Sequence, residues 1–465
     1  MRTVHESIIW LNGYLWGPPM LIILIGTHIF LTFRLRFIQG YTLLAIKLSF
    51  KKDAGGPGDV SHFGALTTAL AATIGTGNIV GVATAVALGG PGAVLWCWLT
   101  GVFGIATKYG EAVLAVKYRE KTSDGTMLGG PMYALSKGLK ANWLAVIFCV
   151  FTAIAAFGIG NMVQANSIAT LVHKTFNVSP YITGFIMSAT VAVVILGGIR
   201  SIGSVCEKLV PFMAVFYILG CAVILFFNAR VLPETVLLII KSAFTPHAAG
   251  GGFVGASVMT AARFGIARGL FSNESGLGSA PIVAAAAQTK NPVKQALVSS
   301  TGTFWDTVVV CAMTGLVIVS EVILSPTDLG GLTGAELTKG AFAKIPVIGP
   351  AALTGGLLTF VFSTILGWSY YGERAVEYLA GKGAIKPYRI VWVVAVFVGS
   401  VASVPVVWDF ADSMNALMAL PNLVSVIFLS GVIVEETRKY LWTGNIESMH
   451  DPDDYGKMAP DMESL

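Results

Sequence analysis

Apolar residues in this chain form long stretches, and short glycine-rich polar segments break two of them. The first break covers residues 71–78 (AATIGTGN), inside an apolar stretch from about 62 to 88. The second covers residues 269–278 (GLFSNESGLG), inside a stretch from about 252 to 288. A helix broken in hydrocarbon leaves backbone amides and carbonyls without partners, so a break persists only where it lines a site that uses them. The pattern predicts a secondary transporter with its site at the two breaks.

The composition of the chain predicts a membrane protein. Hydrophobic residues make up 55% of the 465 residues and charged residues only 12%, whereas soluble proteins carry about a quarter charged residues. Runs of about 20 apolar residues are long enough to span a bilayer. We expect eleven spans, at about 16–37, 62–88 (broken), 91–116, 143–171, 180–198, 208–228, 252–288 (broken), 296–322, 349–371, 389–407 and 411–434.

The distribution of Lys and Arg predicts the orientation. With the 34–60 loop in the cytoplasm, 22 of these residues fall inside and only six outside, while Arg263 and Arg268 lie at the second break. This bias favours an N-terminus outside and a C-terminus in the cytoplasm. The membrane that we expect is the plasma membrane of a prokaryote. Arg2 is balanced by Glu6 and no small-residue cleavage site follows, so we expect no cleaved signal peptide.

The spacing of the breaks predicts an inverted repeat. After a leading helix, the breaks fall in the first and sixth of ten spans, which cross the membrane in opposite directions. We therefore expect a 5+5 all-α fold in four parts. These are 1–60 (extra helix and first cytoplasmic loop), 61–230 (first repeat), 231–436 (outer helix near 234–244, then the second repeat) and 437–465, a cytoplasmic tail whose acidic end predicts disorder.

The first break suits an amino-acid carboxylate and a cation. Gly75 and Gly77 let the backbone unwind and a ligand approach closely. The amides of Thr76, Gly77 and Asn78 begin the outer half-helix, whose positive end favours an anionic group. Carbonyls freed on the inner side, at Ala71, Thr73 and Ile74, are suited to sodium. Close packing of small residues is the alternative for one break alone.

The second break holds an intramembrane acid, Glu274, which is functional or paired by default. Its alternatives are an ion pair with Arg263 or Arg268 and a structural hydrogen bond across the break. Phe271 either walls the pocket or is an ordinary core aromatic. Asp306 is a further buried acid, for which pairing with an arginine and participation in an ion site both remain open.

Two other spans carry polar faces. Gln164 shares a face with Phe157, Gly160 and Asn161, and either binds substrate or makes a helix–helix hydrogen bond. Ser363 and Thr364 hydroxyls could complete a sodium shell, although such hydroxyls more often bond to their own helix. Trp368, one turn further, could cap the pocket.

Cysteine and histidine usage argues against a metal centre or enzyme chemistry. The five cysteines lie in apolar segments without a CxxC pair, so we expect free, buried thiols. The six histidines form no HExxH motif and no GxSxG motif is present. A channel is the other rival, but it needs a continuous pore rather than an occluding site. We expect no cofactor, with Na⁺ only as a coupling ion.

Nearly the whole chain resembles the alanine or glycine:cation symporter family. The most specific match is residues 89–104 (GGPGAVLWCWLTGVFG), which depart from the family pattern at Leu95, where the family has Phe, and at Cys97, where it usually has Met. Both exchanges keep an apolar side chain. Residues 72–79, 129–133, 270–280 and 365–373 also read like family sequence.

This resemblance implies the fold of the bacterial leucine transporter with one extra N-terminal helix. It also implies sodium-driven, or less often proton-driven, uptake of alanine or glycine, with no obligate protein partner and no nucleic acid. The implied substrate pocket comprises Thr73, Ile74, Gly75, Gly77, Asn78, Gln164, Phe271, Ser272, Gly276, Thr364 and Trp368. The implied sodium ligands are the carbonyls of Ala71 and Ile74 and the hydroxyls of Ser363 and Thr364. A related transporter for another small amino acid is the runner-up.

Overall fold

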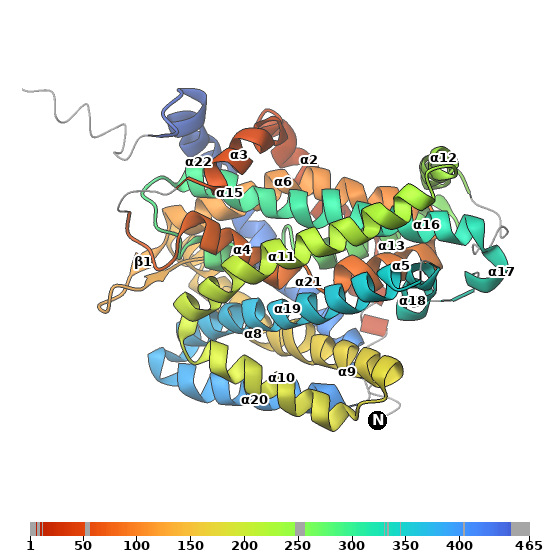
Figure 1. Cartoon of the computed structure of the whole chain (residues 1–465). Coiled ribbons are helices and arrows are strands. Elements are labelled where there is room, and N and C mark those ends of the chain that lie inside the picture. Colours follow the sequence, from red (N-terminus) through yellow and green to blue (C-terminus); the bar gives the residue numbers. More distant parts are fainter. Residues whose placement is uncertain are drawn as a thin grey trace, which may run out of the picture.

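Regular structure in the computed structural model is almost entirely helical (Figure 1). The structure describes Glu6, Trp10, Leu11 and residues 13–51, 56–246, 256–329, 331–332, 334–344, 346–402 and 405–447. Within these ranges the strands are β1 (Glu120–Lys121) and β2 (Met127–Leu128), which pair antiparallel with Glu120 opposite Leu128. The start of the second apolar stretch and the acidic end of the expected tail lie outside the described residues.

The first predicted break lies within residues 71–78, as expected. Helix α4 (His62–Thr73) begins after Ser61, whose side chain accepts a hydrogen bond from the Gly64 amide. It ends where Ile74 turns to an extended conformation with ψ 97°. The chain resumes as a π-helical turn, η2 (Gly77–Gly81), and then α5 (Val82–Gly89), with a bend of 51° between the two halves.

The second predicted break is also present. Helix α13 (Val258–Asn273) ends at Glu274, which adopts a left-handed conformation with φ 57°. Gly276 and Gly278 follow with φ of 89° and 85°, a region that favours glycine. The chain then re-enters the short helix α14 (Pro281–Ala284). Both interruptions therefore contain irregular backbone where the sequence predicted it.

The other predicted spans correspond to helices with shifted ends. They are α2 (Pro18–Arg34), α6 (Ala93–Lys117), α8 (Asn142–Phe157) continuing through η4 (Gly158–Met162) into α9 (Val163–Phe176), α10 (Pro180–Ile195), α11 (Gly198–Phe227), α15 (Pro292–Thr303) continuing through η5 (Phe304–Cys311) into α16 (Ala312–Leu324), α19 (Ile348–Ala380), α20 (Ile385–Val401), and α21 (Pro405–Phe428) followed by α22 (Ser430–Thr437). Among the described residues, six helices are long and apolar enough to span a membrane, or nine if three bent pairs each count as one span. The expected total of eleven stays a prediction.

Shorter elements connect these helices. The helix predicted near 234–244 is present as α12 (Leu232–Phe244), and its place on the outer surface stays a prediction. The remainder are η1 (Ile38–Tyr41), α3 (Thr42–Ser49), α7 (Pro131–Tyr133), η3 (Ala134–Gly138), α17 (Pro326–Leu329), α18 (Gly334–Ala343), η6 (Lys382–Ala384) and η7 (Arg438–Trp442).

Helix α6 packs closely against α13 and α15. The second break, which follows α13, therefore lies beside α6. Small residues permit close approach: a Cβ on Gly269 of α13 would meet the Thr100 hydroxyl, and one on Gly101 would lie 2.7 Å from Cγ2 of Thr307, in the η5 segment that continues α15. Helices α10 and α20 lie side by side on the opposite side of the molecule, with α8 and α19 in between (Figure 1). All five cysteines are free and buried, as predicted.

Candidate functional site

The two breaks lie in contact with each other. A Cβ placed on Gly77 would lie 3.0 Å from Phe271 Cδ1 and 3.2 Å from Ser272 Cα, so only glycine fits there without displacing a neighbour. Every residue that the sequence predicted for the substrate pocket and the sodium shell is buried. The fold thus gathers segments about 200 residues apart around one small region.

The backbone of the first break has neutral side-chain partners. The Gly75 amide donates to Asn78 Oδ1 at 2.9 Å, and the Thr76 amide points to Gln164 Oε1 at 3.5 Å. The Thr76 hydroxyl is buried and has no hydrogen-bond partner among the described residues. Neutral partners and an unsatisfied hydroxyl leave this backbone available to exchange its hydrogen bonds with a ligand.

Helix α19 faces the α4 end of the first break through Thr364. The Thr364 hydroxyl lies 3.2 Å from the Ile74 carbonyl and 2.8 Å from the carbonyl of Phe360. Ser363 donates within its own helix, to the Phe360 carbonyl at 2.9 Å, which is the arrangement that hydroxyls in membrane helices commonly adopt. Thr364 and Ile74 therefore bring two oxygen atoms together, with Ser363 one position away.

The polar face of the α8–η4–α9 segment serves two purposes. Asn161 donates to the Trp392 carbonyl at 2.9 Å and so joins two helices. Gln164 donates to the Ile159 carbonyl at 2.9 Å, which leaves Oε1 directed to the first break. A Cβ on Gly160 would collide with the Trp368 side chain, so this glycine permits close contact with α19.

Glu274 makes hydrogen bonds across the second break. Its carboxylate accepts from the Ser279 hydroxyl and, at 2.9 Å, from the Trp368 indole nitrogen. Arg268, one of the two arginines considered as its partner, instead lies 3.4 Å from Asp412. Of the two alternatives left open by the sequence, the structural hydrogen bond is the one observed. Trp368 is fully buried and connects α19 to the break.

Glu111 on α6 is a functional candidate that the sequence pattern did not reveal. One oxygen, Oε1, accepts from the amides of Gly276 and Gly278 at 3.0 and 3.1 Å and from Asn422 Nδ2 at 2.6 Å. Asn422 also donates to the Gly276 carbonyl at 2.9 Å. The unwound backbone of the second break is therefore held by a buried carboxylate. A Glu inside the 91–116 apolar stretch was the available signal.

Lys108 corrects the charge count made from the sequence. Its charge was counted on the cytoplasmic side, but it lies inside the predicted span 91–116 and within α6, where it is only 3% exposed. Its ammonium group has no hydrogen-bond partner among the described residues. It interacts electrostatically with three buried acids, Glu111, Glu274 and Asp306. Lys108 is therefore part of the charge balance around the breaks and not of a loop.

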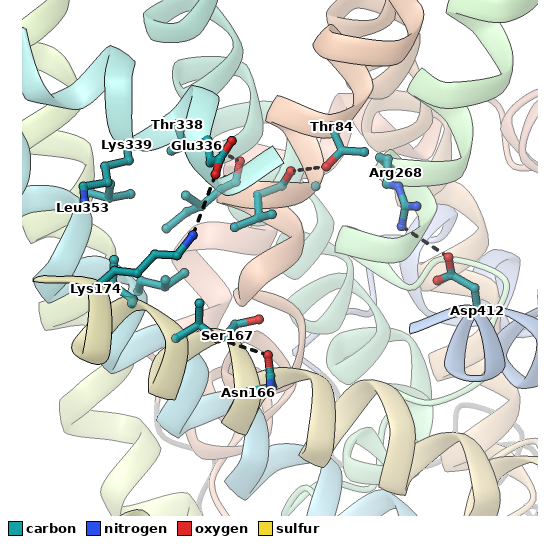
Figure 2. Close-up of a pocket in the computed structure, with 16 residues that line it drawn as sticks. Thr84, Asn166, Ser167, Lys174, Arg268, Glu336, Thr338, Lys339, Leu353 and Asp412 are labelled. Carbon is teal, nitrogen blue, oxygen red and sulfur yellow. Dashed lines mark hydrogen bonds and ion pairs between the residues drawn. The ribbon is translucent and has the colours of Figure 1, made fainter. Parts of the chain in front are cut away.

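A cavity of about 400 Å³ opens beside the second half of the first broken helix, η2 and α5 (Figure 2). Side chains from η2, α5, α9, α18 and α19 form most of its wall. Two ion pairs lie in it: Lys174 and Glu336, 3.8 Å apart, and Arg268 and Asp412. The second pair joins the broken helix α13 to α21.

The opposite end of the broken helices is closed by Arg119. Its guanidinium donates to the carbonyls of Ala285 at 2.9 Å, Ala287 at 2.8 Å and Pro57 at 3.2 Å, and also to that of Thr289. Val60 forms a parallel bridge with Ala287, so the segment before α4 lies against the segment after α14. Burial lowers the pKa of the Arg119 guanidinium to about 10, where it still carries its charge at neutral pH.

Comparisons with known proteins give the same family over the full length. The model of the sodium:alanine symporter family matches residues 1–452. The sodium/alanine symporter AgcS of Methanococcus maripaludis is 53% identical, over 92% of this chain and 95% of its own length. An uncharacterised transporter of Haemophilus influenzae is 50% identical, over 94% and 96%. The probable sodium/glutamine symporter GlnT of Bacillus subtilis is 35% identical, over 95% and 91%.

Solved structures show the fold. The structure of MhsT in complex with L-phenylalanine has a TM-score of 0.60 at 15% identity and covers 84% of this chain and 95% of MhsT. A Na⁺-coupled sialic acid symporter has a TM-score of 0.51 at 10% identity, covering 91% and 87%. The fold is thus of the leucine-transporter type. The chain belongs to the sodium:alanine symporter family and is a multi-pass membrane protein that transports amino acids, not an enzyme.

Proposed function

We propose that this protein is a sodium-coupled symporter that imports alanine or glycine by alternating access. The observation that carries the proposal is the meeting of Thr364 and the Ile74 carbonyl beside backbone amides with neutral partners. Oxygen atoms are the ligands of hard cations, and free amides at a half-helix start suit a carboxylate. The family, and AgcS at 53% identity, support both substrate and ion.

In this proposal sodium binds the carbonyls of Ala71 and Ile74 with the hydroxyls of Ser363 and Thr364. The substrate carboxylate takes the amides of the first break, at residues 75–78. Gln164 and Ser272 provide polar contacts, while Phe271 and Trp368 limit the size of the side chain. Gly276 acts indirectly, because its backbone groups are held by Glu111 and Asn422. Thr73 completes the wall on the inner half-helix.

We also propose the topology that the charge bias predicts. The chain would cross the plasma membrane eleven times as two inverted five-helix repeats after one extra helix, with its N-terminus outside. The cavity beside η2 would then open outward, and the Arg119 contacts would close the cytoplasmic side. Opening of the inner side would require Arg119 to release the carbonyls it binds. Rocking of the broken helices against their neighbours would exchange the two states.

Uptake into proteoliposomes tests the proposal. Labelled alanine is supplied with an inward sodium gradient or an equal potassium gradient, and glycine or leucine is added as unlabelled competitor. We expect uptake that needs sodium, is inhibited by glycine and is unaffected by leucine. Uptake that follows an imposed proton gradient would overturn the sodium coupling. Absence of uptake by protein that is folded in the same vesicles would show that the substrate is wrong.

A further inference from the structure

Helix α3 bends away from the end of α2 and exposes apolar side chains at the protein surface. The bend between α2 and the η1–α3 segment is 68°. Arg36 and Phe37 make this turn in left-handed conformations, with φ of 54° and 57°. The 17 residues of α2 give it a length of about 25 Å, close to the roughly 30 Å of a bilayer core. A bilayer crossed by α2 therefore ends near Arg34, at the level where α3 begins.

Packing fixes the face of α3 that points to the protein. Ala45 and Leu48 are buried, and α3 lies against α15, the helix that follows the second break (Figure 1). The Ser49 hydroxyl donates within the helix, to the Ala45 carbonyl at 2.9 Å. The Phe50 ring lies beside that of Phe63 at the start of α4, with centroids 5.5 Å apart. These contacts hold α3 in one orientation and so determine which side chains face outward.

The outward face of α3 combines apolar and basic side chains. Leu43, Lys47 and Phe50 follow one another at spacings of four and three residues, so they share one side of the helix. Leu43 is 76% exposed and Phe50 is 71% exposed, and apolar side chains of this size gain free energy by leaving water. Lys47 lies between them, exposed and without an ion-pair partner among the described residues. This face therefore suits apolar chains and an anionic group together.

Further basic residues lie at the bend before α3. Arg34 is exposed in the last turn of α2, and its guanidinium lies 5.5 Å from the Phe30 ring centroid. Arg36 lies 4.5 Å from the ring centroid of Trp442. In the part of the chain that the structure describes, neither arginine has a carboxylate partner. Long basic side chains at the end of a membrane helix extend to the lipid headgroups, so the charge at this bend is placed for an anionic headgroup.

We propose that α3 lies in the membrane interface and that its face formed by Leu43, Lys47 and Phe50 binds an anionic phospholipid. The acyl chains contact Leu43 and Phe50, and the headgroup phosphate lies beside Lys47. A bilayer surface supplies apolar chains and negative charge side by side, which is the combination that interfacial helices with basic residues bind. The inference goes beyond the proposed transport function and holds whichever substrate or ion is carried.

Quenching by brominated lipids tests this site in the full-length protein. A fluorescent thiol label is attached to Leu43→Cys, because the five native cysteines are buried, and unmutated protein treated in the same way corrects for labelling at those cysteines. The labelled protein is reconstituted in phosphatidylcholine, phosphatidylglycerol or their mixtures, brominated on the acyl chains. We expect quenching by both lipids, with a relative affinity about fivefold or more higher for phosphatidylglycerol.

Substitutions of Lys47 separate the charge from the apolar contact. Lys47→Gln should lower the preference for phosphatidylglycerol by about fivefold, the effect of one basic side chain at an anionic lipid surface. Lys47→Arg keeps the charge and should keep the preference. A label on Leu219→Cys is the matched control, since Leu219 is exposed in the middle of α11, far along the chain from Lys208 and Arg230. The two lipids should quench it equally.

The outcomes separate the inference from the proposed function. Quenching of the label at position 219 without quenching at position 43 would show that α3 faces water or protein, and would overturn the inference. Equal affinity for the two lipids, or a preference that Lys47→Gln leaves unchanged, would overturn the anionic site. If labelled Leu43→Cys does not fold, Phe50→Cys on the same face takes its place. These measurements do not use alanine uptake, so uptake that ignores sodium would overturn the proposed function alone.

Discussion

The two broken helices expose the same kind of backbone but satisfy it differently. At the first break, the amides of Gly75 and Thr76 meet the neutral side chains of Asn78 and Gln164. At the second, the amides of Gly276 and Gly278 share the carboxylate of Glu111. Hydrogen bonds to a charged acceptor are roughly twice as strong as neutral ones. The second break is therefore fixed in place, whereas the first can exchange partners.

Under the proposed function, this difference favours the first break as the one whose backbone amides bind the substrate carboxylate. A carboxylate from outside the protein can displace an amide oxygen at Gly75 at little cost, because it is the stronger acceptor. At Gly276 it would have to displace another carboxylate, with Asn422 bonded to the same glycine. The second break then stays in place while the first break exchanges its hydrogen-bond partners.

Removal of the Glu111 carboxylate should have the largest effect. Glu111→Ala leaves the Gly276 and Gly278 amides without their acceptor and Asn422 Nδ2 with only the Gly276 carbonyl, and buried donors without partners cost about 1–3 kcal/mol each. We expect a loss of stability on the order of 3 kcal/mol or more and no alanine uptake. Thermal unfolding in detergent, followed by the monodisperse fraction, measures the first effect.

Two further variants separate the hydrogen bonds from the charge. Glu111→Gln retains an oxygen acceptor and should lose less stability than Glu111→Ala. Glu321→Ala removes another buried acid and should leave uptake close to the wild-type rate, since Glu321 contacts Asn228 and neither break. Equal stability of Glu111→Ala and the wild type would show that the second break does not depend on this carboxylate.

The positions of both breaks could be predicted from the sequence because their signals are local. Polar side chains and freed backbone groups are costly at membrane depth, so residues 71–78 and 269–278 stand out from the apolar stretches around them. Thr364 and Gln164 could be identified as candidates for the same reason, since each is a polar group at membrane depth. The family resemblance selected the same region.

The partners of these residues could not be predicted, because they come from distant segments. Glu111 and Gly276 are 165 positions apart, and no periodicity in either segment relates them. Glu274 adopts a left-handed conformation where helix α13 ends, and there its carboxylate accepts hydrogen bonds from Ser279 and Trp368. Lys108 was counted with the cytoplasmic end of the span 91–116, because no pattern in the sequence relates it to the acids that allow it to be buried.

At the first break, Gly75→Ala should impair uptake with little loss of stability. The added Cβ would lie 2.6 Å from the Thr364 hydroxyl and 3.5 Å from Gln164 Oε1, so it enters the proposed sodium and carboxylate sites. Thr364 can rotate away, and we expect a stability change of about 1 kcal/mol or less. Alanine uptake is measured at a series of sodium concentrations. The half-saturating sodium concentration should be higher than in the wild type by about tenfold or more, which is about 1.4 kcal/mol of binding free energy.

Gly302→Ala is the matched control for this substitution. The nearest atoms to its added Cβ are at 3.7 and 3.9 Å, which is ordinary contact within the buried helix α15. It should retain wild-type uptake and sodium dependence. If Gly75→Ala instead unfolds as readily as Glu111→Ala, the first break is as tightly constrained as the second and the contrast between them fails.

The smallest effect should come from the ion pair between Arg268 and Asp412 in the cavity beside η2. Asp412→Asn removes the charge but keeps the Trp16 indole bond to the Asp412 carbonyl. Arg268 is 21% exposed beside the cavity, so water can solvate it, and its guanidinium also lies 5.7 Å from the Phe271 ring centroid. Part-exposed pairs contribute about 1 kcal/mol or less, so the KM for alanine should change by roughly fivefold at most. Loss of uptake in folded Asp412→Asn would mean that the second broken helix is also held through its ion pair with α21. Glu336→Gln is the control, because it breaks the more exposed pair with Lys174 in the same cavity. It should leave the KM unchanged, and so it distinguishes loss of the pair between Arg268 and Asp412 from a general change in cavity charge.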